Sequence, residues 1–94
     1  MPLVFEWNQR KALGNLRKHR VSFAEAALVF SDPLARIFVD EDHSAAERRE
    51  IIIGHSKRLL VVCFTERANG RVRIISARSA TRGEQQDYEE HVTG

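Results

Sequence analysis

The fold of this chain is decided by residues 59–79, LLVVCFTERANGRVRIISARS, in which a turn separates two apolar segments. Residues 59–65 are apolar at odd and even positions alike, as in a central strand that is covered on both faces. Asn69-Gly70 is the strongest hairpin signal in the sequence, because both residues tolerate a positive φ. Residues 71–79 then form the returning strand. This stretch therefore predicts the antiparallel centre of a β-sheet.

Three further segments predict the remaining strands. Residues 49–54 contain the run Ile51-Ile52-Ile53 and precede a polar turn at 55–58. Residues 34–39 form another strand candidate, and residues 3–7 a short opening strand. Together with the central hairpin, they supply the strands of one antiparallel sheet.

Helices are predicted where a capping residue precedes apolar residues at helical spacing. Ser22 with Glu25, and Thr81 with Glu84, have the spacing of a capping box. The predicted helices are residues 9–20 after Asn8, a second helix from the Ser22 box to a point before Pro33, and a last helix from the Thr81 box to about His91. The order β-α-α-β-β-β-β-α with short loops predicts an α+β fold, in which residues 1–94 form a single domain.

Length and composition restrict the class of protein. A chain of 94 residues with 43% hydrophobic content can build one core but not two. The single cysteine, Cys63, excludes an internal disulfide framework. No run approaches the length of a membrane span, and the first residues do not resemble a signal peptide. We therefore expect a reduced, cytoplasmic protein that does not engage a membrane.

The charges are segregated along the chain, although the net charge is only +2. Residues 9–20 and 71–82 carry basic side chains and no acidic ones, whereas acids gather at 40–50 and 84–90. Most of the basic residues are arginines, whose planar fork suits phosphate geometry. If the two basic stretches meet in space, they form a phosphate-binding field. The alternative is that both are ordinary solvated faces.

No motif for a metal or cofactor is present. The sequence lacks a phosphate-cradling glycine loop, a His-Glu-x-x-His helix and a Gly-x-Ser-x-Gly elbow. The four histidines are scattered, with no pair at i, i+4. Cys63 lies within an apolar strand, where a thiol is normally an inert core residue. We therefore expect no metal site and no cofactor.

The first predicted helix carries a polar stripe of Lys11, Asn15, Lys18 and His19. Such a stripe could bind phosphate, with His19 as a proton donor or acceptor. It could equally be a solvated helix face.

Two arginines fall on otherwise apolar strand faces. Arg49 shares a face with Ile51, and Arg78 alternates with apolar residues of the last strand. Such a guanidinium needs an acidic partner or a position where a substrate reaches it. Glu84 and Asp87 are possible partners of Arg78. Arg73 and Arg78 are separated by an odd number of positions along the strand, so their side chains share a face only if a bulge intervenes.

A set of motif residues extends over nearly the whole length of the chain. Its N-terminal part is Phe5-x-Trp7-Asn8-x-x-Lys11-x-x-x-Asn15-x-x-Lys18-His19-x-Val21-x-Phe23. It continues through Phe30-x-Asp32-Pro33, Glu47-x-Arg49, Gly54, Leu60-x-Val62, and Arg73-Ile74-Ile75-Ser76-Ala77-Arg78-x-Ala80-Thr81-x-x-Glu84-x-x-x-Tyr88. This set resembles the pattern of the BrnT-type toxins. Two positions depart from that pattern, which commonly has Asp in place of Asn8 and Gly in place of Arg20.

The resemblance implies a ribonuclease toxin with a RelE-like fold, from a bacterial type II toxin–antitoxin pair. It implies neutralisation by a BrnA-type antitoxin, a small DNA-binding protein. It also implies that the complex represses its own operon and that the antitoxin contacts the operator DNA. The absence of a metal motif agrees with metal-independent RNA cleavage, in which the 2′-hydroxyl attacks the adjacent phosphorus.

Such cleavage requires an ionised nucleophile, charge stabilisation on the phosphoryl oxygens and a proton for the leaving oxygen. Tyr88 could stack on a base, or could instead anchor the last helix to the sheet. The expected catalytic residues are Arg49 and Arg78 as phosphate clamps, His19 as acid or base and Glu84 as a weaker candidate base; the expected RNA-binding residues are Lys11, Lys18, Arg73 and Tyr88.

Two other functions are compatible with the residues. The first is a non-catalytic module of the same fold that binds RNA or a protein. The second is direct DNA binding, which is disfavoured because no recognition helix with clustered base-reading side chains is evident.

Overall fold

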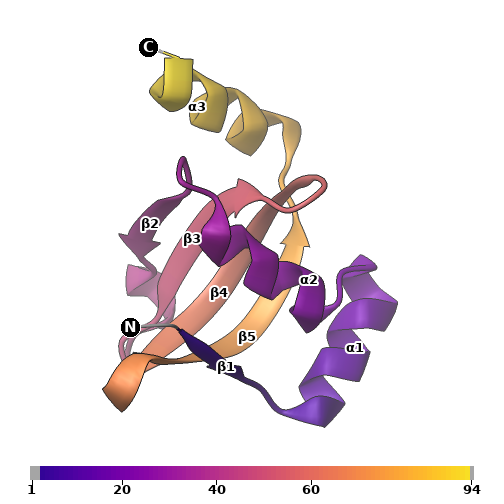
Figure 1. The fold of residues 1–94 in the computed structure, drawn as a ribbon, viewed down its shortest axis with the longest axis vertical. Helices are drawn as coiled ribbons and strands as arrows, with labels where there is room; N and C mark the ends of the chain where they lie inside the picture. The colour runs from indigo at the N-terminus through magenta and orange to yellow at the C-terminus, as the bar shows by residue number, and fades with distance from the viewer. Residues whose placement is uncertain (1–2, 94) are drawn as a thin grey trace.

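The computed structural model describes residues 3–93, in which five strands and three helices follow the predicted order (Figure 1). The strands are β1 (Val4–Glu6), β2 (Arg36–Val39), β3 (Glu50–His55), β4 (Leu59–Arg67) and β5 (Arg71–Ser79), and the helices are α1 (Gln9–His19), α2 (Phe23–Leu28) and α3 (Arg82–Thr93). Residues 1, 2 and 94, which the sequence analysis included in the single domain, lie outside the described residues. Within residues 3–93, no helix has the length and apolar character needed to span a membrane.

The sheet is mixed, with strand order β1-β5-β4-β3-β2. Strands β2 to β5 pair antiparallel as predicted, but β1 pairs parallel to β5, from Val4 opposite Arg71 to Glu6 opposite Arg73. The expectation of a wholly antiparallel sheet is therefore wrong at this edge. The reason is the connection: after β1 the chain crosses the sheet through α1 and α2 before β2 begins at the other edge (Figure 1). No hairpin sets the direction of β1.

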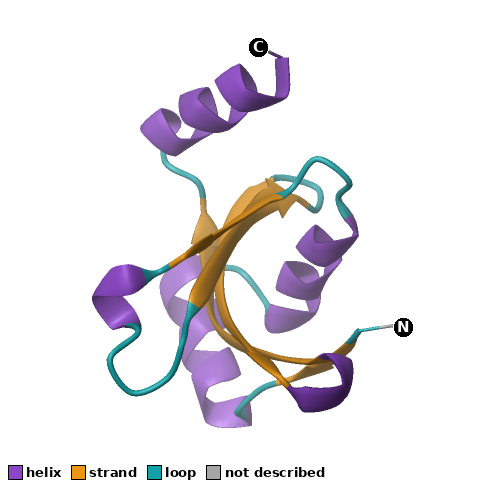
Figure 2. Cartoon of the chain, turned by 90° about the vertical axis from the view of Figure 1, so that its left-hand side faces the viewer, coloured by secondary structure: helices purple, strands orange, loops and turns teal. Residues whose placement is uncertain are grey.

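Strand β4 lies at the centre, and its first residues, from Leu59 to Val62, are buried on both faces as its apolar run predicted, whereas Cys63 is only half-buried. On one face, Leu60, Val62 and Phe64 are buried in a core that includes residues of α2. On the other face, Leu59 and Val61 pack in a smaller cluster with α3. Figure 2 shows the sheet strongly curved between its helices, with α3 beyond one end.

A β-bulge lies in β5 at Ile75. Cys63 of β4 pairs with Ser76 and Phe64 pairs with Ile74, so Ile75 is the extra residue. The bulge reverses the alternation of side chains along the strand. Ile74 and Ala77 both enter the core under α2, although they differ by an odd number. Arg73 and Arg78 consequently lie on the same face of the sheet, which the alternation argument allowed only with a bulge.

Asn15 joins α1 to the edge of β5. Its amide nitrogen donates to the carbonyl oxygens of Val21 and Ala77 at 2.9 and 2.8 Å, and its Oδ1 accepts from the backbone N–H of Ala77 at 3.1 Å. The side chain is buried, with the residue only 8% exposed. Asn15 therefore does not belong to an exposed polar stripe, as its spacing suggested, but forms a structural junction.

The predicted helix caps are present. Asn8 accepts from the backbone N–H of Lys11 at 3.1 Å, and Ser22 accepts from that of Glu25 at 3.0 Å. The Glu25 carboxylate binds the guanidinium of Arg58 on the β3–β4 turn. Helix α1 ends at His19, and its C-cap residue Arg20 adopts the left-handed conformation with φ 59°. A glycine would adopt this conformation without steric cost.

We expect Asn15→Ala to lower the free energy of unfolding by about 2–4 kcal/mol, because it leaves buried backbone groups of Val21 and Ala77 without partners. Urea denaturation measures the change. Arg17→Ala, an exposed change on the same helix, is the control and should stay within about 0.5 kcal/mol of the wild type. A loss of equal size in both variants would contradict the role of Asn15.

We expect Arg20→Gly to raise the free energy of unfolding by about 0.5–1 kcal/mol, because glycine relieves the left-handed strain while the Arg20 carbonyl that Arg58 binds is retained. Arg17→Gly is the matched control inside the helix and should lower stability by about 1 kcal/mol. Thermal melts of both variants measure these changes. If Arg20→Gly destabilised the protein, the left-handed conformation of Arg20 would not be a source of strain.

Candidate functional site

A cavity of about 350 Å³ opens on the sheet face opposite the core under α2. Strands β3, β4 and β5 form its floor, and the segment between β2 and β3 forms a wall. The lining residues are Asp40, His43, Arg49, Ile51, Val61, Cys63, Ile75, Ser76 and Arg78. Both expected phosphate clamps, Arg49 and Arg78, are among them.

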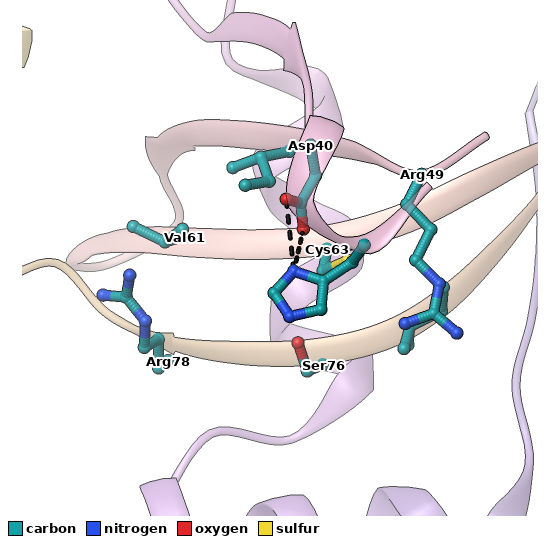
Figure 3. Close-up of a pocket in the computed structure, with 9 residues that line it drawn as sticks. Asp40, Arg49, Val61, Cys63, Ser76 and Arg78 are labelled. Carbon is teal, nitrogen blue, oxygen red and sulfur yellow. Dashed lines mark hydrogen bonds and ion pairs between the residues drawn. The ribbon is translucent and has the colours of Figure 1, made fainter. Parts of the chain in front are cut away.

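Arg49 and Arg78 lie at opposite ends of this cavity, with Cys63 and Ser76 between them (Figure 3). Arg49 directly precedes β3, whereas Arg78 follows the bulge near the end of β5. Within the described chain, no carboxylate lies within 4.0 Å of the Arg49 guanidinium. Burial raises the pKa of the Cys63 thiol, which keeps it protonated and unsuited to nucleophilic attack.

Arg78 is held by Glu84, one of the two partners that the sequence suggested for it. Its two terminal nitrogens donate to the two Glu84 oxygens at 2.7 and 2.8 Å. The hydrogen bond from Arg78, assisted by those from Thr81, lowers the pKa of Glu84 to about 2. The carboxylate is therefore ionised at neutral pH, and this fork-to-fork contact orients the guanidinium while leaving its Nε–H for another ligand.

Helix α3 supplies Glu84 through a reciprocal capping box. The Thr81 hydroxyl accepts from the Glu84 N–H at 3.2 Å, and the Glu84 carboxylate accepts from the Thr81 N–H at 2.9 Å. The cap that starts the helix thus also positions the acid that holds Arg78.

The cavity wall is a short loop that closes on itself. The Ser44 hydroxyl donates to the Asp40 carbonyl at 2.5 Å and accepts from the Arg49 N–H at 3.1 Å, and the Asp40 N–H donates to the Arg49 carbonyl at 2.9 Å. Inside this loop, His43 Nδ1 contacts the Asp40 carboxylate at 3.0 Å. This pair was not predicted from the sequence. Its local signal was the i, i+3 spacing of an acid and a histidine between two strands.

The three α1 candidates do not line the cavity. Lys11 and Lys18 are exposed and His19 is half-buried, one helical turn on either side of Asn15. Since Asn15 binds β5 at Ala77, these side chains flank the sheet edge next to Arg78. Arg73 lies on the cavity face but outside the lining, and donates to Glu6 at 3.2 Å.

Tyr88 anchors α3, which is one of the two roles that the sequence left open. Its side chain is only 4% exposed and packs with Ile53, Leu59 and Val61. The hydroxyl donates to Asp32 at 3.1 Å, and burial raises the pKa of this phenol. In this arrangement the ring supports the helix that carries Glu84.

We expect Glu84→Gln to lower the free energy of unfolding at neutral pH by about 1 kcal/mol, a figure discounted because both partners are partly exposed. The pKa of Glu84 falls from 4.5 to about 2 in the folded state, so its stabilising effect is complete above pH 4.5 and is lost as the pH falls toward 2. Urea denaturation between pH 2 and 7 should show the wild type and variant converging at low pH. Glu90→Gln on the same helix is the control, and a constant difference across the range would contradict the pairing.

Comparison with known proteins adds independent evidence. Residues 7–84 match the family described as the ribonuclease toxin, BrnT, of type II toxin–antitoxin systems. A crystal structure of the Brucella abortus ribonuclease toxin BrnT aligns over 86% of this chain and 100% of that chain, with 25% sequence identity and a TM-score of 0.66. No curated protein sequence matches. Since the family match spans most of its residues, the chain belongs to the BrnT family of ribonuclease toxins.

Proposed function

We propose that this protein cleaves RNA without a metal ion, by attack of a 2′-hydroxyl on the adjacent phosphorus, and that cleavage inhibits translation and growth. The observation that carries the proposal is the placement of Arg49 and Arg78 at the two ends of one accessible cavity. Their permanent charges supply the electrostatic stabilisation that a metal supplies in other nucleases. The RelE-like fold implied by the resemblance is part of this proposal.

The reaction forms a bond between O2′ and phosphorus and breaks the bond between phosphorus and O5′. The products are a 2′,3′-cyclic phosphate and a free 5′-hydroxyl. Negative charge grows on the non-bridging oxygens as the attack proceeds. A guanidinium on each side of the phosphate binds these oxygens more strongly in the transition state than in the ground state, and this difference accelerates the reaction.

The other residues assist at a distance from the phosphorus. Glu84 fixes the orientation of Arg78, and Tyr88 fixes the helix that carries Glu84. Lys11 and Lys18, exposed beside the end of β5, hold the flanking RNA backbone, and Arg73 extends the positive face along the strand. His19, expected from the sequence as a proton donor or acceptor, does not line the cavity. We therefore assign it no proton-transfer step.

The partner in the cell is a BrnA-type antitoxin that holds the toxin inactive in the cytoplasm. The complex binds operator DNA through the antitoxin and represses the operon. Family membership supports this assignment, because type II toxins are paired with protein antitoxins.

The test is incubation of purified, antitoxin-free protein with naked RNA in excess EDTA. We expect cleavage that leaves 2′,3′-cyclic phosphate ends. Arg49→Ala and Arg78→Ala should each reduce the rate by about 100- to 1,000-fold, because each removes a donor to the developing charge. Arg67→Ala, an exposed arginine at the far end of β4, is the matched control and should cleave like the wild type.

Melting curves of every variant show that the fold is retained. Full activity of the double variant Arg49→Ala, Arg78→Ala would refute this site even though the family is established. If the wild type leaves naked RNA intact, the same assay on translating ribosomes decides between a ribosome-dependent nuclease and a non-catalytic RNA- or protein-binding module.

A further inference from the structure

We propose that His43 is the general acid of the reaction, which donates a proton to the leaving O5′, and that Asp40 is its positioning residue. This inference rests on the proposed RNA cleavage and adds to it the group that completes proton transfer. No feature of the sequence had singled out either residue as functional.

The contact between the two residues leaves one ring nitrogen for a ligand. His43 Nδ1 lies 3.0 and 3.2 Å from the two Asp40 oxygens, and with the proton on Nδ1 the carboxylate accepts it. The other nitrogen, Nε2, is not engaged by this contact. The imidazole side chain is 66% exposed, whereas its carboxylate partner is only 14% exposed. The Asp40 carboxylate is therefore shielded from solvent, whereas the His43 imidazole is accessible to a ligand.

The loop places this imidazole beside the phosphate-binding groups. His43, Arg49 and Arg78 all line the same cavity. Ser44 bonds to both Asp40 and Arg49, so one closed loop carries the imidazole and one of the clamps. A group that transfers a proton must lie within hydrogen-bond reach of the substrate atom, and a loop of this kind restricts its position relative to the bound phosphate.

Charged groups of both signs surround His43. Asp40 contributes a negative charge in direct contact, while Arg49 from the start of β3 and Arg78 from β5 contribute positive charges that a bound phosphate offsets. Cys63 of β4 is a neutral thiol, and Ser76 is uncharged. Imidazole is also the side chain that changes charge between about pH 5 and 8.

The proton balance closes with one histidine. The 2′-hydroxyl loses its proton to water as O2′ bonds to phosphorus. His43 Nε2 delivers a proton to O5′ as the P–O5′ bond breaks, and water then returns a proton to the ring. No oxidant, metal or second protein base is needed.

The other three histidines are placed elsewhere. His55 packs edge to face on Tyr88 and lies near Asp32, and His91 contacts the Asp87 carbonyl on α3. His19 lies on α1. Within the described residues, His43 is thus the histidine that lines the arginine cavity.

The decisive experiment compares two leaving groups. An RNA oligonucleotide that the wild type cuts is remade with a sulfur in place of O5′ at the cleaved linkage. A thiolate leaves without protonation, so loss of a general acid should matter only for the oxygen substrate. We expect His43→Gln to slow cleavage of ordinary RNA by about 100- to 10,000-fold but to cut the sulfur-containing RNA at a rate within about 10-fold of the wild type.

Arg49→Ala and His91→Gln are the matched controls. Arg49→Ala should slow cleavage of both substrates, because the Arg49 guanidinium stabilises the phosphoryl oxygens whichever group leaves. His91→Gln should cleave both substrates like the wild type. If His43→Gln slowed cleavage of the two substrates equally, the assignment would be overturned. It would also be overturned if His19→Gln abolished cleavage while His43→Gln remained active. A wild type that cuts neither naked nor ribosome-bound RNA would instead refute the proposed function itself.

Asp40→Asn tests the positioning residue. The amide retains the shape of the side chain but no longer presents two carboxylate oxygens to His43 Nδ1. We expect Asp40→Asn to slow cleavage of ordinary RNA, with kcat reduced and KM little changed, but to cut the sulfur-containing RNA at a rate within about 10-fold of the wild type. Equal slowing on the two substrates would show that Asp40 supports only the loop and would overturn its assigned role.

Discussion

The buried amide of Asn15 is the interaction on which the arrangement of the domain depends. Within residues 3–93, strand β1 pairs with β5 from Arg71 to Arg73, so no strand lies beside this edge of β5 at Ala77. Asn15 supplies the donor and the acceptor that such a strand would supply, and it also binds the carbonyl of Val21 between α1 and α2. Because unpaired buried polar groups are costly, this one side chain fixes where α1 lies and where α2 begins.

The same junction determines the direction of Arg78. Upstream of Ala77, the bulge at Ile75 reverses the side-chain alternation; at Ala77, the bonds to Asn15 hold the reversed register in place. Ala77 then enters the core and Arg78 emerges on the opposite face. Glu84 adds a second restraint from α3. The Arg78 guanidinium is therefore oriented by backbone geometry on one side and by a helix cap on the other, which would limit the reorganisation needed for the proposed anion binding.

Local sequence signals were sufficient to predict the order of the helices and strands. Asn69 and Gly70 both have a positive φ in the observed hairpin, and Ser22 caps its predicted helix. Long-range partners were not predictable. Spacing grouped Asn15 with the exposed lysines of α1, because nothing local shows that an amide will meet a strand 62 residues later. The parallel pairing of β1 and the site of the bulge are likewise settled by packing across the sheet. His43 has a local partner, but its relation to Arg49 and Arg78 depends on how the whole loop closes.

Arg49 and Arg78 differ in their electrostatic surroundings, and this difference bears on how a domain of net charge +2 could present the proposed anion site. Arg78 is neutralised by Glu84, so it contributes fixed geometry more than long-range attraction. Arg49 has no carboxylate at salt-bridge distance among residues 3–93, so its field extends into the cavity. In the proposed reaction, an approaching phosphate would be attracted chiefly by Arg49 and then oriented by Arg78. Separating attraction from orientation in this way limits the mutual repulsion of two cations, which would otherwise act against holding both at one site.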